Sequence, residues 1–260
     1  MHPHLIRNPK GFDPDGYTDI TRIGENQADT GIELGILRMP AGRVTRACAQ
    51  REGALLLMKG ELTFVLPEPE GRAVVGRESV FEDDPICLHY PKGFPLHMEA
   101  LTDVELVYVG VDNDASFEPL LFDGHTMLEK EHRGKGQLDE TATRIVRTIF
   151  DLRNRPQCKL VLGEVINFPG RWSSYPPHHH PQPEIYHYRF DKPQGYGHGE
   201  LGDEVLKIRH GDTLKILDNR DHSQCAAPGY AMYYLWAIRH LPGEPYTVPE
   251  FTQEHRWMLG

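Results

Sequence analysis

The sequence predicts an all-β protein made of two β-barrels in tandem, and three observations support this expectation. Glycine and proline are frequent, with 25 and 21 of the 260 residues, and both are spread along the whole chain. Short apolar runs with strand-like alternation follow one another at close spacing, which is typical of strands joined by tight turns. The two halves of the chain also resemble each other over roughly 110 residues, which indicates an internal duplication.

The first half, residues 1–112, is expected to form one barrel. Its strand-like segments lie at 31–37, 54–66 (with a break at 59–61), 85–90, 97–101 and 104–111. Residues 113–140 are polar and contain glycine, so we expect a linker or crossover there. Strand-like segments resume at 144–150, 160–168, 184–190, 204–208, 213–217 and 231–238, which predicts a second barrel over residues 141–260.

The duplication is clearest around two histidines. Each half contains a turn, then a histidine and then an apolar strand, with His97 in the first half and His222 in the second. The first half has no pair of metal-binding side chains near residues 47–52. We therefore expect the first barrel to lack a metal site and to serve structure or assembly.

A metal site is predicted in the second half from four side chains. His178 and His180 are two residues apart, so on a strand their side chains share one face. Glu184 follows a proline-containing turn, and His222 comes from a later strand. Three imidazoles and one carboxylate can hold one divalent Zn, Mn or Fe ion and leave positions open for a substrate. This spacing is known from cupin barrels, which are double-stranded β-helices of the jelly-roll type. Three adjacent histidines can also be a coincidence of a surface loop, and His179, at the odd position, is expected to face away from the metal.

Candidates for proton transfer come from the strands near these ligands. Tyr186 and Tyr188 have the same strand parity as Glu184, so they are expected to face the barrel interior, where a tyrosine hydroxyl can relay a proton. Filling the barrel is the alternative role for both. Glu200 is a third candidate, whereas His187 and Arg189 have the opposite parity and are expected to point outward.

Candidates for substrate binding are a cation and two tyrosines. Arg171 could pair with an anionic substrate, although a solvated charge at a strand edge is the common alternative. Lys207, Arg209 and Lys215 are further cations of this kind. Tyr230 and Tyr234 lie at the last long strand, where one of them could touch the ligand and where tyrosine is also simply a good strand former.

Composition excludes several classes of function. The chain carries 28 basic and 38 acidic residues, a net charge of −10, so its surface repels nucleic acids and anionic membranes. The sequence contains no apolar window long enough to cross a membrane and no apolar signal segment at its start. Its four cysteines show no CxxC pairing, so we expect reduced cysteines in a cytoplasmic protein.

Several blocks resemble the 5-deoxy-glucuronate isomerase family of inositol catabolism, a bicupin family. These blocks are Leu5-Ile-Arg, Arg51-Glu, Glu131-His-Arg-Gly-Lys-Gly, Trp172-Ser-Ser-Tyr-Pro-Pro-His-His-His, Lys192-Pro-Gln-Gly and Ala226-Ala-Pro-Gly-Tyr. The resemblance implies isomerisation of 5-deoxy-D-glucuronate to 5-dehydro-2-deoxy-D-gluconate. Family members usually have a lysine between the two histidines and a longer insert before the glutamate. The Pro-Gln-Pro insert of this chain is nearer in length to the related hexosulose-uronate isomerases of pectin breakdown.

Other functions stay open at this stage. One alternative is isomerisation of a different uronate or hexosulose-uronate. A second is an iron-dependent cupin dioxygenase, which would consume O₂, and a third is a sugar-binding cupin without catalysis. A small sugar acid is the expected partner, and the analogy with cupins predicts a homo-oligomer.

Overall fold

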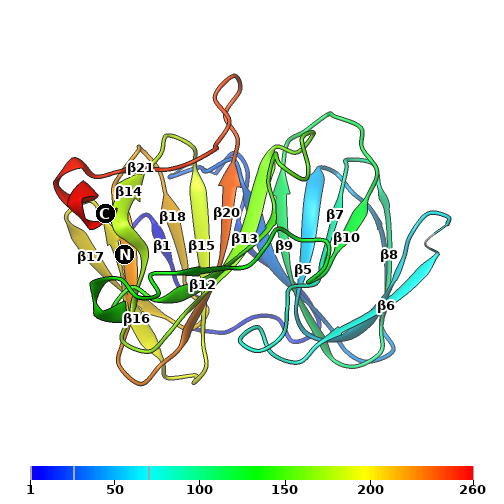
Figure 1. Ribbon diagram of the computed structural model, residues 1–260. Coiled ribbons are helices and arrows are strands. Elements are labelled where there is room, and N and C mark those ends of the chain that lie inside the picture. Colours follow the sequence, from blue (N-terminus) through cyan, green and yellow to red (C-terminus); the bar gives the residue numbers. More distant parts are fainter. Residues whose placement is uncertain (1, 26, 70, 260) are drawn as a thin grey trace.

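The computed structural model describes residues 2–25, 27–69 and 71–259, and within these the fold is all-β. The strands form three sheets in this part of the chain, and none of the three closes on itself. Strands of the first half lie beside strands of the second half, with β9 and β13 near the centre of Figure 1. No helix of the described chain is long and apolar enough to cross a membrane.

The first half forms one nine-stranded sheet. Its main path runs β10-β7-β5-β9-β3-β2, and β4, β6 and β8 join it beyond β5. The strands are β2 (Gly16–Thr21), β3 (Glu33–Met39), β4 (Val44–Cys48), β5 (Glu52–Val65), β6 (Arg72–Arg77), β7 (Cys87–Tyr90), β8 (Pro95–Ala100), β9 (Val104–Val111) and β10 (Leu120–Phe122).

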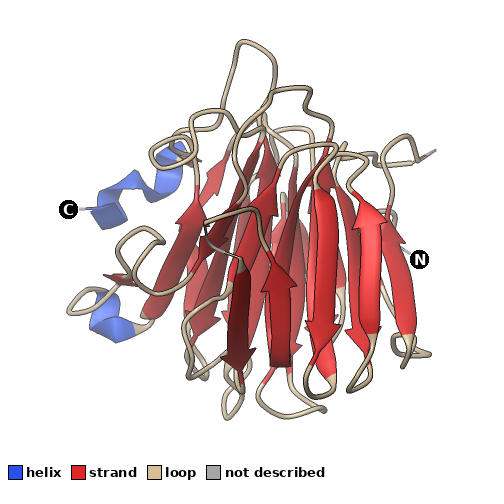
Figure 2. Cartoon of the chain, turned by 90° about the vertical axis from the view of Figure 1, so that its right-hand side faces the viewer, coloured by secondary structure: helices blue, strands red, loops and turns tan. Residues whose placement is uncertain are grey.

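The second half forms a seven-stranded and a five-stranded sheet. The first has the order β1-β18-β15-β20-β13-β12-β11, with β1 (Leu5–Ile6), β11 (Glu131–Arg133), β12 (Arg144–Phe150), β13 (Leu160–Asn167), β15 (Glu184–Phe190), β18 (Thr213–Ile216) and β20 (Met232–Arg239). The second has the order β17-β16-β19-β14-β21, with β14 (Trp172–His179), β16 (Tyr196–Leu201), β17 (Glu204–Arg209), β19 (His222–Ala226) and β21 (Glu250–Phe251). Two short 3₁₀ helices, η1 (Leu138–Glu140) and η2 (Gln253–Leu259), lie at one edge of the molecule in Figure 2.

The ends of the predicted linker belong to different sheets. Within residues 113–140, β10 pairs with β7 of the first half and β11 pairs with β12 of the second half. The N-terminal β1 pairs with β18, so the first strand of the chain lies in the sheet of the second half. The division into domains at residues 112 and 141 stays a prediction.

The expected break at 59–61 is wrong, because β5 continues from Glu52 to Val65 as one strand. The register against β9 shifts between Leu57 and Lys59, which is the mark of a β-bulge. Gly60 follows with a φ of 100°, and a Cβ there would meet the Asp103 carbonyl oxygen at 2.3 Å. The strand therefore bends at this glycine and changes partners, from β7 before the bend to β6 and β8 after it.

Three apolar clusters make up the core. One lies inside the first half and includes Leu57, Phe64 and Leu106, and another lies inside the second half and includes Tyr188 and Leu214. The third joins the halves, since it combines strands β3, β5 and β9 with β12, β13, β15 and β20. The outward-facing side of the seven-stranded sheet is thus covered by the first half.

This covering changes the place of two residues that were expected to point outward. His187 and Arg189 do leave the interior of the second half, but they are 0% and 6% exposed because the first half packs over them. Arg189 donates to a carboxylate oxygen of Glu105 on β9 at 2.9 Å, and Arg38 donates to the other oxygen at 2.8 Å. The side chains that alternate outward on this strand therefore contact the first half of the molecule instead of solvent.

A buried ionic cluster around Glu164 also joins the halves. Arg77 of β6 donates to both oxygens of the Glu164 carboxylate on β13, at 2.7 and 2.9 Å, and neither side chain is exposed. Tyr233 of β20 donates to the same carboxylate at 2.7 Å, and Arg147 of β12 lies 3.5 Å away. The carboxylate is the only acid in this cluster among the described residues, so it balances two buried guanidinium groups.

Replacing this carboxylate should destabilise the whole protein. We expect Glu164→Ala to lower the free energy of unfolding by about 3–5 kcal/mol, because two buried cations lose their counter-ion. Urea unfolding monitored by tryptophan fluorescence measures this change. Asp114→Asn, which removes an exposed partner of Lys92, is the control and should leave the unfolding midpoint unchanged. Equal effects of the two substitutions would contradict a special role of the buried cluster.

Candidate metal centre

The four predicted metal ligands come from two facing sheets. His178 lies near the end of β14, His180 directly follows that strand, and Glu184 begins β15 after the short turn at 181–183. His222 begins β19 and is the register partner of His178. The structure therefore brings all four side chains to one end of the second half, between the five-stranded and seven-stranded sheets.

Three of these side chains form a compact group. Ligand atoms of His180, Glu184 and His222 all lie within 4.8 Å of one another. The Glu184 Oε2 atom is 3.1 Å from Nε2 of His180 and 3.3 Å from Nε2 of His222. His178 stands at the edge of the group, with its ring centroid 4.4 Å from that of His222 and 6.4 Å from that of His180.

The Nδ1 atoms of His180 and His222 reveal the tautomer of each ring. The tautomer decides whether the Nε2 atom that faces Glu184 is a donor or an acceptor. Nδ1 of His180 lies 2.9 Å from the Gln182 carbonyl oxygen, and Nδ1 of His222 lies 3.0 Å from that of Arg220. A carbonyl oxygen only accepts, so each Nδ1 carries the proton and donates. In the neutral rings both Nε2 lone pairs then point at Glu184. Two acceptors that face each other repel unless a proton or a metal cation lies between them. Donation of Nδ1–H to a backbone carbonyl is also typical of metal-bound histidine.

Burial adds to the need for a cation. The side chains of Glu184 and His222 are 3% and 1% exposed, and Nε2 of His222 has no hydrogen-bond donor or acceptor partner with good geometry. Burial opposes ionisation of Glu184, but its close contacts with the His180 and His222 rings outweigh burial and bring its pKa down to about 2, so the carboxylate is ionised. Burial, together with the neighbouring His222, lowers the pKa of His178 well below its usual value, so this ring is a neutral donor of a lone pair. An ionised carboxylate among imidazole nitrogens is a donor set that fits a divalent metal ion.

His179 lies apart from this group. Its Nδ1 is 2.6 Å from the Asp221 carboxylate, and its Nε2 is 3.6 Å from Glu250 of β21. The alternating side chains of β14 therefore place His179 on the opposite face from His178 and His180.

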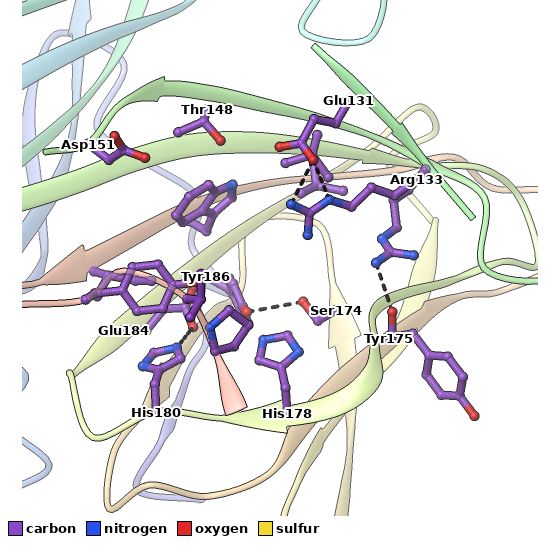
Figure 3. A pocket seen from close by; sticks show the side chains of 18 of the residues that line it. Glu131, Arg133, Thr148, Asp151, Ser174, Tyr175, His178, His180, Glu184 and Tyr186 are labelled. Carbon is purple, nitrogen blue, oxygen red and sulfur yellow. Dashed lines mark hydrogen bonds and ion pairs between the residues drawn. The ribbon is translucent and has the colours of Figure 1, made fainter. Parts of the chain in front are cut away.

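The candidate ligands open into a cavity of about 430 Å³, which is in the size range of small-molecule sites. Figure 3 shows His178, His180, Glu184 and Tyr186 on one side of this cavity, with Glu131, Arg133, Thr148 and Asp151 on the other. Further lining residues are Arg144, Arg153, Ser174, Tyr175, Tyr234 and Tyr246. Residues 246–249, together with Phe251 of β21, form part of the wall.

Two predicted tyrosines line the cavity and share a chain of hydroxyl groups. The Tyr186 hydroxyl is 3.2 Å from Ser174 Oγ, which is 3.3 Å from the Tyr234 hydroxyl. Tyr234 is in turn 2.5 Å from Ser173 Oγ. Burial, and then the charge of Glu184, raises the pKa of Tyr186 well above its usual value, so its hydroxyl is protonated at neutral pH.

The other predicted site residues lie outside the cavity lining. Tyr188 is buried deeper in the same core, and its hydroxyl has no hydrogen bond to any described residue. Glu200 accepts a hydrogen bond from Ser223 on the neighbouring strand. Arg171 donates to the Asp139 carbonyl oxygen at 3.4 Å, and Tyr230 packs near Tyr196.

The cations that do line the cavity are Arg133, Arg144 and Arg153, which the sequence analysis did not single out. They come from β11, β12 and the turn after β12, between 25 and 45 residues before His178. One signal was present, because Arg133 belongs to the Glu131-His-Arg block noted for its resemblance to a family.

The fold is all-β and cupin-like, and the site contains a His/Glu cluster that could hold a metal ion. A cupin barrel protein from Leptotrichia buccalis shares the fold with a TM-score of 0.51 at 13% identity, over 86% of this chain and 88% of that one. An IolB-like protein from Salmonella typhimurium LT2 is similar over 98% of this chain and 99% of that one, with a TM-score of 0.84 and 21% identity. The 5-deoxy-glucuronate isomerase of Geobacillus thermodenitrificans is 25% identical over 234 residues, which cover 80% of this chain and 79% of the relative.

The KduI/IolB family model matches residues 5–258. The chain therefore belongs to the KduI/IolB family, as the sequence blocks predicted. The match extends from β1 to η2 and thus covers both halves of the molecule.

Loss of a buried imidazole should abolish metal binding. We expect His222→Ala to weaken metal affinity by more than the roughly 10- to 100-fold that is lost when only a hydrogen-bond partner of a ligand is removed. His179→Ala is the matched control and should bind metal as the wild-type protein does, since this ring faces the other way. Metal content after dialysis, measured by mass spectrometry, compares the two variants. Retention of metal in both would show that the ligand assignment is wrong.

Proposed function

We propose that the chain is a metal-dependent aldose–ketose isomerase that converts 5-deoxy-D-glucuronate to 5-dehydro-2-deoxy-D-gluconate in inositol catabolism. Relatives over most of the chain are named 5-deoxy-glucuronate isomerase, which supports this substrate and reaction. The observation that carries the proposal is the pair of Nε2 lone pairs facing the Glu184 carboxylate inside a cavity of substrate size. The three alternatives, namely another uronate, an iron-dependent dioxygenase and a sugar-binding cupin without catalysis, have no such support from the relatives.

The proposal includes a bicupin architecture. Residues 1–112 would form a barrel without metal ligands, residues 113–140 a linker, and residues 141–260 the barrel that carries the metal site. Two features support it: the interior of the first half is filled by an apolar cluster, whereas the second half holds the cavity. A cytoplasmic location and a homo-oligomeric state, with a small sugar acid as the partner rather than nucleic acid or membrane, complete the proposal.

One divalent ion per chain, Zn, Mn or Fe, would be held by His180, Glu184 and His222, with His178 as the fourth ligand. Bound there, it would act as a Lewis acid on the substrate's oxygen atoms and favour the negative charge that develops during isomerisation. The chain's contribution is to orient the imidazoles, through the Nδ1–H bonds to backbone carbonyls. The side chains of His180, Glu184 and His222 are themselves buried.

An aldose–ketose isomerisation also needs a proton to move between two neighbouring carbon atoms. Tyr186 is placed for this transfer, because it lines the cavity beside Glu184 and its hydroxyl is protonated. Because this hydroxyl is protonated, Tyr186 would donate a proton to the substrate rather than accept one from carbon, and its hydrogen bond to Ser174, which continues to Tyr234, orients it. Tyr188 and Glu200 lack access to the cavity, so we assign the transfer to Tyr186.

The proposed reaction can be tested by proton NMR of 5-deoxy-D-glucuronate in D₂O with metal-loaded protein. We expect the ketose product to appear, and deuterium at the reacting carbon would report exchange of the transferred proton with solvent. His222→Ala should give no product, because its ligand set is incomplete. Oxygen consumption without ketose would instead indicate the dioxygenase, and no change with metal bound would indicate a different sugar acid.

Removing the Tyr186 hydroxyl should slow turnover without loss of metal. We expect Tyr186→Phe to lower kcat by roughly 100- to 10,000-fold, the usual contribution of a positioned proton donor or acceptor. Tyr188→Phe is the control, and it should keep kcat close to the wild-type value because its hydroxyl makes no hydrogen bond. Steady-state kinetics on proteins with equal metal content make the comparison. A Tyr186→Phe enzyme with normal kcat would rule out the assignment.

A further inference from the structure

The buried arginines of this protein are paired with carboxylates, with one exception. Arg77 and Arg147 share Glu164, and Arg189 pairs with Glu105. Such pairing is expected, because removing a guanidinium from water costs several kcal/mol unless a counter-ion is present. The exception is Arg144 on β12, which is 7% exposed and forms no ion pair with any carboxylate that the structure describes.

Arg144 uses its donors on two backbone carbonyls instead. One Nη group donates to Ala142 at 2.7 Å, and the other donates to Tyr175 at 2.9 Å, a bond that ends at the labelled Tyr175 in Figure 3. These bonds fix the orientation of the guanidinium but leave its positive charge unbalanced. Burial lowers the pKa of Arg144 from its usual value, and the group still remains a cation because the intrinsic pKa of arginine is so high.

Among the residues that the structure describes, the charges around the cavity leave Arg144 as the cation without a carboxylate partner. Arg133 pairs with Glu131 at 2.9 Å and Arg153 pairs with Asp151 at 2.7 Å, so these two arginines of the lining are balanced. The remaining acid of the lining, Glu184, is directed at the imidazoles. A divalent ion there would make the ligand side of the cavity positive, so Glu184 would not be a counter-ion for Arg144.

We propose that Arg144 binds the carboxylate of the substrate, at the end of the sugar opposite to the atoms that react at the metal centre. The inference rests on the proposed function and names the group that selects an acid over a neutral sugar. An incoming carboxylate supplies the missing counter-ion, and the two carbonyl bonds hold the guanidinium ready for it. Selection by this residue also sets which end of the substrate enters first, because the carboxylate and the reacting carbonyl are at opposite ends of a uronate.

A purely structural role is the competing explanation. In that case Arg144 would only fasten the Tyr175 carbonyl and so hold the segment that leads to His178. Its loss would then damage the turnover of acidic and neutral sugars equally and reduce the metal content. A carboxylate-binding role damages the turnover of the acid alone.

The decisive experiment compares kcat/KM for 5-deoxy-D-glucuronate and for 5-deoxy-D-glucose, which has an alcohol in place of the carboxylate. We expect the wild-type enzyme to prefer the acid and Arg144→Gln to reduce that preference by roughly 10- to 150-fold, the usual value of a hydrogen bond to a charged group. Arg153→Gln, a cavity arginine already balanced by Asp151, should change the preference by no more than about fivefold. An equal fall for both sugars in Arg144→Gln, or an unchanged preference, would overturn the inference.

A binding measurement separates failure of this inference from failure of the proposed function. Calorimetric titration of zinc-loaded protein with D-glucuronate and with D-glucose needs no turnover. A preference for glucuronate that disappears in Arg144→Gln would support the inference even if 5-deoxy-D-glucuronate were not isomerised. A preference that persists in the variant would place the carboxylate on the metal, and no preference in the wild-type protein would leave Arg144 without the role; either result overturns it.

Discussion

The buried carboxylate of Glu164 is the constraint on which the arrangement of the two halves depends. It binds Arg77 of the first half and Arg147 and Tyr233 of the second half, so four strands meet at one charged group. Its own strand, β13, pairs with β20, which in turn pairs with β15 that carries Glu184. The Glu164 cluster thus holds the seven-stranded sheet in place from the side opposite to the candidate metal centre. This stability offsets the cost of the unpaired lone pairs and the unbalanced cation at the cavity.

The metal centre itself is organised by very local contacts. The Nδ1–H groups of His178, His180 and His222 donate to the carbonyls of Pro176, Gln182 and Arg220, each two residues away in the chain. The tautomer of each ring therefore follows from the turn or strand end in which it sits. This locality explains why residue spacing alone could predict the group, while the distance between the sheets still had to come from the fold.

The sequence predicted most of the strands that alternate cleanly, such as β9, β12 and β15, and brought His180, Glu184 and His222 into one hypothesis. It gave no strand for β14, whose two prolines lack N–H groups and interrupt the ladder with β19 between Ser173 and His178. It also did not find Arg144, because the contact of β12 with the cavity depends on the order of strands in the sheet. The alternation of side chains along the strand correctly predicted that Tyr186 faces inward. It could not show that Glu200 accepts a hydrogen bond from Ser223 instead of lining the cavity.

The two halves use one strand position for different purposes. Glu52 begins β5 as Glu184 begins β15. The Glu52 carboxylate contacts His89 at 3.0 Å and accepts hydrogen bonds from the Asn113 side chain and the Lys159 backbone, at 2.6 and 2.9 Å. Two of these partners are N–H donors and the third is one imidazole. The hydrogen-bonding capacity of the Glu52 carboxylate is therefore satisfied, and its bonds tie the first half to the second. At Glu184 the surrounding nitrogens are acceptors instead, and the same kind of buried carboxylate becomes a place for a cation. Hydrogen-bond polarity, more than residue type, thus separates a structural glutamate from a metal-binding one in this fold.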